Sequence, residues 1–376
     1  MTHGPALWSN GNRDEPHTLV VIFLRGGADG LTLVPPVGDD AYHSARPSIG
    51  IGARAGIRLD DCFSLHEKLA PIAPLFHDGH LEVVHAVGSD DTTRSHFEAQ
   101  DRMEHGGAAA GGWLGRFLRA RDGATSGALA AVAIGTELPE SLRGAPSAAV
   151  LRSLAEFEFG ATTPKLLAGL ESLYQQAPGD MGRALGGAAR DTVAALRRIE
   201  QLRASPSRPS HGAVYDSDDF GRDLSEVARL ITARVGLLVA TVDLGGWDSH
   251  VAQNTLLDPL MQRLARGLAA FHRDLGPDGL SRTTVVVLTE FGRRVAENAS
   301  LGTDHGRGSV MMLLGAGVTG GRVRARWPGL ESRLLDGPGD VPVTTDYREV
   351  LAPLLALHGA PDAARIFPDW SAVSSV

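Results

Sequence analysis

Short apolar runs alternate with amphipathic stretches along most of this chain. Runs rich in valine, isoleucine and leucine predict buried β-strands over residues 19–24, 81–88, 130–135, 237–244, 283–291 and 310–315. Apolar residues at helical spacing predict helices over residues 95–105, 255–275 and 347–358. Strands that alternate with helices in this way predict an α/β fold, with a mainly parallel sheet covered by helices on both faces.

Residues 151–235 break this alternation. They contain helical patterns at 163–176, 181–203 and 220–235, with a turn-rich linker at 205–212, and no clear strand. We therefore expect a helical insertion or cap at 151–235 within one α/β domain that spans residues 18–376. The polar residues 1–17 are expected to form a flexible N-terminal arm.

A glycine motif at residues 315–320 fits the dinucleotide-binding pattern G-x-G-x-x-G. That site needs a helix directly after the glycines, whose N-terminus holds the pyrophosphate. The chain continues instead with GRVRARWPG, which is typical of another strand. We therefore interpret the motif as a glycine-rich turn between two strands.

Composition narrows the choice of partners and compartment. The chain has 376 residues, with 36 Lys and Arg against 44 Asp and Glu and a net charge of -8, which makes a nucleic-acid partner unexpected. The longest apolar run, residues 236–244, is far shorter than the ~20 residues of a membrane span. The first 17 residues contain neither an apolar core nor a twin arginine, so we expect a cytoplasmic protein without a membrane partner. A lone cysteine, Cys62, leaves no internal disulfide and no cysteine-based zinc site.

Acidic and histidine residues gather directly after the predicted strands. In an open α/β sheet, the carboxyl ends of the strands form the crevice that binds ligands. Carboxylate and imidazole groups are ligands of zinc, manganese and iron, so these positions predict one or two divalent metal ions. The candidate ligands are Asp29, Asp248, His250, Glu290, Asp304 and His305.

The segment after residues 81–88 leads into a helix and offers hydroxyl groups. Thr92, Thr93 and Ser95 lie where backbone N–H groups and the helix dipole favour an anion. One of them could act as a nucleophile, and Ser95 could equally be the helix N-cap, with Glu98 closing a capping box. Arginines cluster at the same loops and favour a small anionic substrate; they are Arg25, Arg94, Arg293, Arg294 and Arg307.

Five motifs in this order, LRGGADGL, RSHFEAQD, GGWDSH, TEFGRR and GTDHGRG, resemble the DUF1501 family of bacterial proteins, over about residues 18–370. The family is grouped with the alkaline phosphatase/sulfatase superfamily. The resemblance implies a three-layer α/β sandwich of the alkaline phosphatase type, with a metal centre at the strand ends and a Ser or Thr nucleophile.

Matched motif by motif, the resemblance also implies a role for individual residues. Asp29 resembles the first carboxylate ligand, Asp248 and His250 the aspartate–histidine pair, and His305 the last histidine. Glu290 takes the place of the aspartate in the superfamily's Asp-His-Gly motif.

The chain departs from the superfamily's pattern in two features and from the family's in a third. Phe291 stands where the Asp-His-Gly motif has its histidine, so one imidazole is missing or is replaced by Asp304. The similarity of residues 90–98 to the phosphomutase segment of the superfamily favours Thr92 as the nucleophile. The position of Ser95 at the start of the predicted helix favours Ser95 instead. Family members commonly carry a twin-arginine export signal, which this sequence lacks.

These observations favour a metal-dependent hydrolase or transferase that acts on a phosphate or sulfate ester. Thr92 or Ser95 would attack, Arg94 or Arg293 would clamp the anion, and His96 would lie among the catalytic residues. A first alternative is a non-haem iron oxidative enzyme, with Asp248, His250 and His305 as its two histidines and one carboxylate. A second is a non-catalytic binding protein on a hydrolase-like fold.

Overall fold

The computed structural model of the chain describes residues 17–52, 55–122, 127–154, 197–204 and 208–371, together with isolated positions between 169 and 194. The expected arm and the helix at 163–176 lie almost wholly outside the described residues, and so does the start of the 205–212 linker. Of the helix expected at 181–203, residues 197–203 are described and helical. A short antiparallel pair, β2 (Ile57–Arg58) and β3 (Ser64–Leu65), forms a separate two-stranded sheet. The division into one domain with an insertion stays a prediction.

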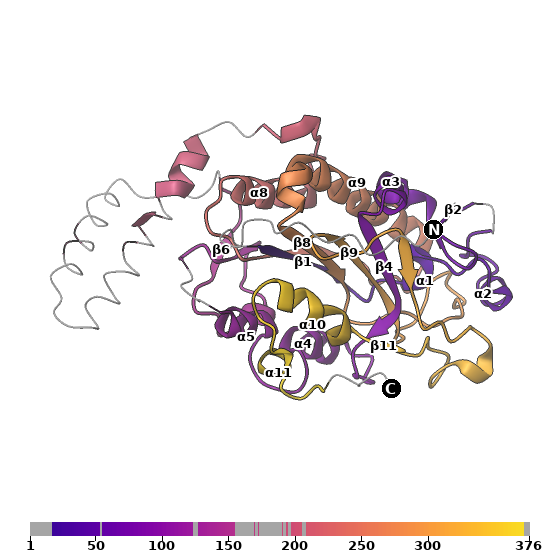
Figure 1. Cartoon of the computed structure of the whole chain (residues 1–376). Coiled ribbons are helices and arrows are strands. Elements are labelled where there is room, and N and C mark those ends of the chain that lie inside the picture. The colour runs from indigo at the N-terminus through magenta and orange to yellow at the C-terminus, as the bar shows by residue number, and fades with distance from the viewer. Residues whose placement is uncertain are drawn as a thin grey trace, which may run out of the picture.

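One mixed sheet forms the centre of the molecule (Figure 1). Its order is β10-β4-β9-β8-β1-β7-β5-β6, and β11 also pairs with β4. The strands are β1 (Thr18–Arg25), β4 (Leu81–Gly88), β5 (Ala131–Ile134), β6 (Ala149–Leu151), β7 (Val239–Gly245), β8 (Thr283–Leu288), β9 (Ser309–Gly315), β10 (Arg322–Arg324) and β11 (Thr345–Asp346). The six predicted strands are all present. The strand predicted at 283–291 is β8, which ends at Leu288.

Strand direction is parallel except at one strand. β1 pairs parallel with β7 and with β8, in registers such as Val20 with Ala240 and with Val285. β9 runs antiparallel to both of its neighbours, β4 and β8. The mainly parallel sheet is confirmed, and β9 is the exception that the apolar pattern does not reveal.

Helices cover both faces of the sheet, which makes three layers and confirms the predicted α/β sandwich (Figure 1). On one face lie η1 (Glu67–Ile72), α3 (Ala73–His77), α8 (Asp219–Thr232) and α9 (Gln253–Leu280). On the other lie α4 (His96–His105), α5 (Trp113–Ala120), α10 (Tyr347–Leu357) and α11 (Ala363–Ile366). Outside these layers are α1 (Gly30–Leu33), α2 (Asp40–Ala45), η2 (Glu140–Leu142), η3 (Ser210–Gly212) and η4 (Ser332–Leu334).

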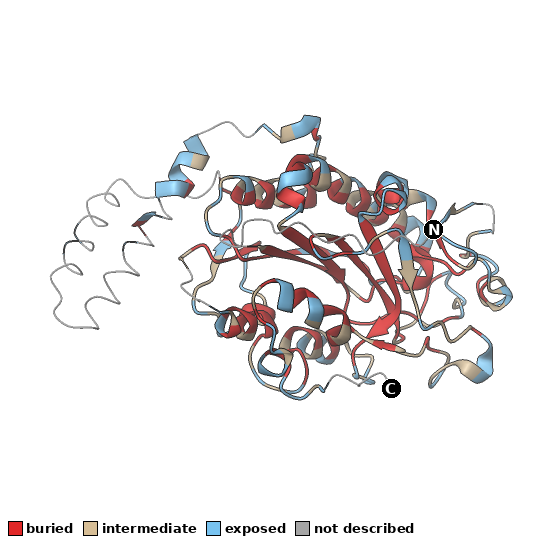
Figure 2. Ribbon diagram, viewed as in Figure 1, coloured by how far each residue is buried: buried red, intermediate tan, exposed pale blue. Residues whose placement is uncertain are grey.

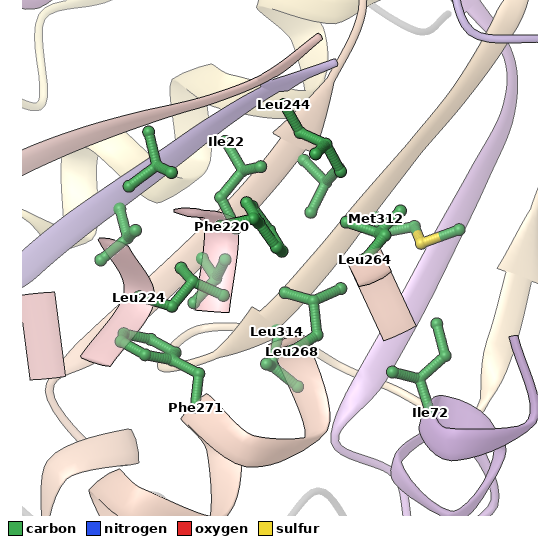
Figure 3. Close-up of a cluster of buried hydrophobic side chains, with 14 of the residues drawn as sticks. Ile22, Ile72, Phe220, Leu224, Leu244, Leu264, Leu268, Phe271, Met312 and Leu314 are labelled. Carbon is green, nitrogen blue, oxygen red and sulfur yellow. The ribbon is translucent and has the colours of Figure 1, made fainter. Parts of the chain in front are cut away.

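Each face of the sheet contributes to a separate apolar cluster. Ile22 and Leu244 pack with Phe220, Leu264 and Phe271 of α8 and α9 (Figure 3). The opposite face packs against α5, α10 and α11. The strands are buried along almost their whole length, which explains why they appear in the sequence as continuous apolar runs rather than alternating ones (Figure 2).

The glycine motif at 315–320 is confirmed as a turn between strands. Gly315 ends β9, the chain turns with Gly317 at φ +76°, and β10 then pairs with β4. No described helix is both long and apolar enough to cross a membrane.

Candidate metal centre

The directions of the strands bring distant segments to one edge of the sheet. The parallel strands β1, β7 and β8 end there, so the segments that begin at residues 26, 246 and 289 meet. Because β9 is antiparallel, it begins at this same edge, and the loop that carries His305 arrives there too. Helix α4, which follows β4, contributes its first residue, His96.

Three imidazoles converge on one carboxylate oxygen. The Nε2 atoms of His96, His250 and His305 lie 3.6, 3.1 and 3.3 Å from Oδ1 of Asp248. Ligand atoms of His96, Asp248 and His305 all lie within 4.8 Å of one another, so they could bind one ion. His250 adjoins this group, with its Nε2 2.9 Å from Nε2 of His305.

Acceptors behind the three rings determine which nitrogen faces inward. Nδ1 of His96 lies 2.9 Å from Oε1 of Glu290, and Nδ1 of His305 lies 2.8 Å from the carbonyl oxygen of Arg94. Nδ1 of His250 lies 3.5 Å from Oδ1 of Asp304. A ring that donates its Nδ1–H to such an acceptor directs the lone pair of Nε2 toward the centre, as metal-binding histidines do.

Hydrogen bonds within the chain do not satisfy all the nitrogens at the centre. Nε2 of His96 is buried and has no hydrogen-bond partner among the described residues. Nε2 of His250 and of His305 face each other, although with both Nδ1 atoms protonated neither has a hydrogen to donate. A cation between these nitrogens would satisfy all of them, so the donor set fits a divalent metal ion of the zinc type.

Electrostatics keep Asp248 ionised. Burial raises its pKa, but the hydrogen bond and charge of Arg293 and the charge of His250 outweigh burial and lower this pKa to about 2. The Arg293 Nη2 lies 2.7 Å from Oδ1 of Asp248. The same guanidinium is buried and donates to the carbonyl oxygens of Gly26, Gly27 and Thr303, so it holds the strand-end loops together around Asp248.

Glu290 lies one layer behind the imidazoles. It is fully buried, and its Oε1 accepts hydrogen bonds from the Gly26 backbone, from His96 and from Gln100. Burial raises its pKa, but these hydrogen bonds prevail and lower the pKa to about 2. The structure therefore places Glu290 as the support of His96 rather than beside the other ligand atoms.

Phe291 and His96 together account for the missing imidazole of the Asp-His-Gly motif. The Phe291 ring lies 4.9 Å from the rings of both His96 and His305, measured between centroids, and packs against them. The position expected for a histidine is thus an apolar support, and α4 supplies the imidazole instead. The sequence held one signal for this: His96 lies at the start of a helix that directly follows a predicted strand.

Asp29 is engaged elsewhere. Its carboxylate caps α1 and receives Arg46 at 2.5 and 3.1 Å, together with Thr32 and Gln253. Burial raises the pKa of Asp29, but Arg46 outweighs burial and lowers it. The structure does not bring Asp29 into the group of converging ligand atoms, although Gln253 connects it to Thr303 and Ser249 beneath that group.

The candidate nucleophiles lie directly before His96. Thr92 and Thr93 are exposed, and the Thr93 hydroxyl both donates to Asp91 and accepts from the Ser95 backbone. Ser95 is the N-cap of α4, but its side chain makes no capping hydrogen bond in the described structure, so the expected capping box is not formed. The Ser95 hydroxyl is therefore not used by the helix.

The clustered arginines are paired with acids. Arg25 binds Asp243 and Glu104, whereas the guanidinium of Arg94 faces Asp340. Arg294 lies 3.3 Å from Asp304, and Arg307 lies 2.5 Å from Asp336. These contacts hold loops at the edge of the sheet, so a substrate anion would have to compete with a carboxylate for each of these arginines.

A cavity of about 1300 Å³ opens on the same side of the sheet. The ends of β5 and β7 and the first turns of α8 line it, together with Arg25 and Gln100. Because Gln100 also donates to Glu290, this cavity adjoins the support of His96.

Comparison with known proteins identifies a family and several distant structures. The family described as "Protein of unknown function (DUF1501)" matches residues 82–359, about three quarters of the chain, which confirms the resemblance seen in the motifs. A search of curated proteins finds no match.

Among solved structures, a protein in the alkaline phosphatase superfamily from Vibrio parahaemolyticus is 11% identical, with a TM-score of 0.42 over 95% of this chain and 71% of its own. The structure titled Ps i-CgsB is 11% identical, with a TM-score of 0.40 over 92% and 72%. A putative sulfatase from Bacteroides thetaiotaomicron is 11% identical, with a TM-score of 0.33 over 96% and 76%. Because these identities and TM-scores are low, the function of this chain has to be inferred from its own residues.

Proposed function

Since the chain belongs to the DUF1501 family, whose description leaves its activity open, we propose from its own residues that it is a metal-dependent hydrolase or transferase of a phosphate or sulfate ester. The observation that carries this proposal is the convergence of three Nε2 atoms on Asp248 Oδ1, with the rings of His96 and His305 held from behind through Nδ1. Such second-layer acceptors are typical of metal-binding histidines.

His96, Asp248 and His305 would hold the ion, with His250 beside them. A bound divalent ion supplies a Lewis acid that polarises the ester and lowers the pKa of an attacking oxygen. Glu290 keeps His96 in the tautomer that presents Nε2, and Arg293 keeps Asp248 ionised and in place. The protein's part is thus to orient the ligands before substrate arrives.

The start of α4 favours an anionic substrate beside the ligands. His96 is the first residue of this ten-residue helix, so free backbone N–H groups and the positive end of the helix dipole lie next to the centre. Ser95 is a better candidate for the nucleophile than Thr92, because its hydroxyl makes no capping hydrogen bond and it directly precedes His96. Thr92 is exposed and lies four residues before His96 in the chain. A small phosphate or sulfate ester is therefore the proposed substrate.

Metal analysis and turnover together test this function. The purified chain is supplied with zinc, manganese or iron(II), desalted, analysed for metal and assayed with an aryl phosphate and an aryl sulfate. We expect about one equivalent of metal and metal-dependent release of the aryl alcohol, both lost in His305→Ala and retained in His77→Ala, which removes an exposed histidine of α3. Less than a tenth of an equivalent in every sample would contradict the metal centre.

The same samples distinguish the alternatives. Iron-dependent oxygen consumption without ester cleavage would favour the oxidative enzyme, and bound metal without turnover of either ester would favour the binding protein. Loss of ester cleavage in Ser95→Ala with metal retained would identify the nucleophile.

A further inference from the structure

We infer that Arg94 is a positioning residue: its backbone carbonyl orients His305, and its guanidinium fixes that carbonyl by binding Asp340. The inference rests on the proposed function, because it assigns His305 as a metal ligand. It replaces the role that the sequence predicts for Arg94, which is to clamp the substrate anion.

The backbone of Arg94 adopts an uncommon conformation. Its φ is +57°, in the left-handed region where a side chain is disfavoured and where such residues gather at functional sites. With this backbone, the carbonyl oxygen lies 2.8 Å from Nδ1 of His305. That contact keeps Nδ1 protonated and leaves Nε2 of the same ring 3.3 Å from Oδ1 of Asp248.

The side chain holds this conformation from the opposite direction. Nε of Arg94 donates to Oδ2 of Asp340 at 2.7 Å, and Nη2 donates to the same oxygen. Asp340 is fully buried, so this anchor is shielded from solvent. Nη1 donates at 3.3 Å to the carbonyl of Thr92, two residues earlier, and thereby closes the loop on itself.

A close approach of backbone makes room for this anchor. Gly337 has a φ of +48°, and a Cβ there would come within 2.7 Å of Nη2 of Arg94. The guanidinium of Arg94 therefore packs against Gly337 of the 336–340 loop, where a side chain would leave no room for it. The loop before α4 and a loop near the C-terminus are joined in this way behind the metal ligands.

Zinc affinity tests the inference, measured by competition with a chromophoric chelator on the full chain. We expect Arg94→Ala and Asp340→Asn to bind zinc at least about tenfold more weakly than the unmodified chain, the range for lost second-layer contacts. Arg94→Gly accepts the left-handed backbone without strain, so the same loss in this variant assigns the effect to the missing anchor. Arg94→Lys, which keeps the charge, is expected to recover part of the affinity.

Arg234→Ala is the matched control. Arg234 is also left-handed, with φ +53°, and lies after α8, 3.8 Å from Asp278 and outside the metal centre. It is expected to bind zinc as the unmodified chain does. Circular dichroism and thermal unfolding of the metal-free proteins identify any variant that fails to fold. If Arg94→Ala fails to fold, Arg94→Gly takes its place.

A spectroscopic measurement separates orientation from general stability. In chains labelled with ¹⁵N-histidine, the Nδ1–H resonance of His305 is expected to be protected from solvent exchange and to lose this protection in Arg94→Ala and Asp340→Asn. Zinc affinities within twofold of Arg234→Ala, with the resonance unchanged, would overturn the inference and leave the proposed function standing. An unmodified chain that binds none of zinc, manganese or iron(II) would overturn both.

Discussion

At the scale of single residues, the candidate centre has an inner layer of converging ligand atoms and an outer layer of groups that support them. Both layers contain carboxylates. Asp248 contacts three imidazoles, whereas Glu290, equally acidic, supports one imidazole from behind. The difference depends on which atom faces inward. A sequence gives residue types and loops, and therefore predicts the gathering of these residues better than the role of each.

The outer layer provides a direct prediction. Glu290→Gln keeps the size of the side chain but removes the charge that favours the Nδ1-protonated tautomer of His96. We expect zinc affinity to fall by about 10- to 100-fold. Glu82→Gln is the control, because Glu82 is a buried carboxylate of β4 that pairs with Arg322 and Arg324 away from the centre. Equal zinc affinities of the two variants would contradict the supporting role of Glu290.

The pair formed by Asp29 and Arg46 leads to a second prediction. Both side chains are fully buried, so Arg46→Met leaves an uncompensated carboxylate and should lower the free energy of unfolding by about 3–5 kcal/mol. Asp29→Asn combined with Arg46→Met should recover part of that loss. Urea unfolding measures both variants.

The same pair bears on the number of metal ions. Because Arg46, Thr32 and Gln253 already occupy the oxygens of Asp29, we expect one equivalent of zinc rather than two in the unmodified chain. Two equivalents, with one lost in Asp29→Asn, would restore Asp29 as a ligand. The sequence could not reveal this engagement, because the arginine lies 17 positions away, at the end of the short helix α2 that the apolar pattern does not predict.

At the scale of elements, the central strands were the most predictable part of the molecule. β1, β4 and β8 are covered on both faces, and such strands leave uninterrupted apolar runs. The short strands β6 and β11 left no such run, since they form where an edge or a neighbour is available for pairing. The reversed direction of β9 was equally hidden, although it brings His305 to the centre.

Helix α8 carries a testable dependence on pH. Burial and the neighbouring carboxylates Asp219 and Glu226 raise the pKa of Asp223 to about 7. An unfolded aspartate has a pKa of about 3.9, so between about pH 4 and 7 the folded state binds more protons and loses stability as the pH rises. Asp223→Asn should therefore be more stable than the unmodified chain at pH 8, by about 1–2 kcal/mol for a partly buried group, and no more stable at pH 4.

Thermal unfolding at the two pH values measures this difference. Asp61→Asn, which removes an exposed charge beside Arg58, is the matched control. A stabilisation of Asp223→Asn that is the same at pH 4 and pH 8 would contradict the raised pKa.

At the scale of the whole molecule, the candidate ligands come from segments that are far apart in the chain. His96 follows β4, Asp248 follows β7, and His305 precedes β9. An ion that binds these three residues would link both halves of the sheet at one edge. Because the group forms only when the sheet is assembled, metal binding and folding should be coupled.

Zinc should therefore stabilise the entire chain. At a free zinc concentration one hundred times the dissociation constant, the free energy of unfolding should rise by about 2.7 kcal/mol, and a chelator should reverse this. Denaturant unfolding with and without zinc measures the change. His96→Ala combined with His305→Ala should abolish it, whereas His77→Ala should leave it intact. An equal zinc effect in the double variant would place the stabilising ion elsewhere, since the group formed by His96, Asp248 and His305 would then have lost two of its three members.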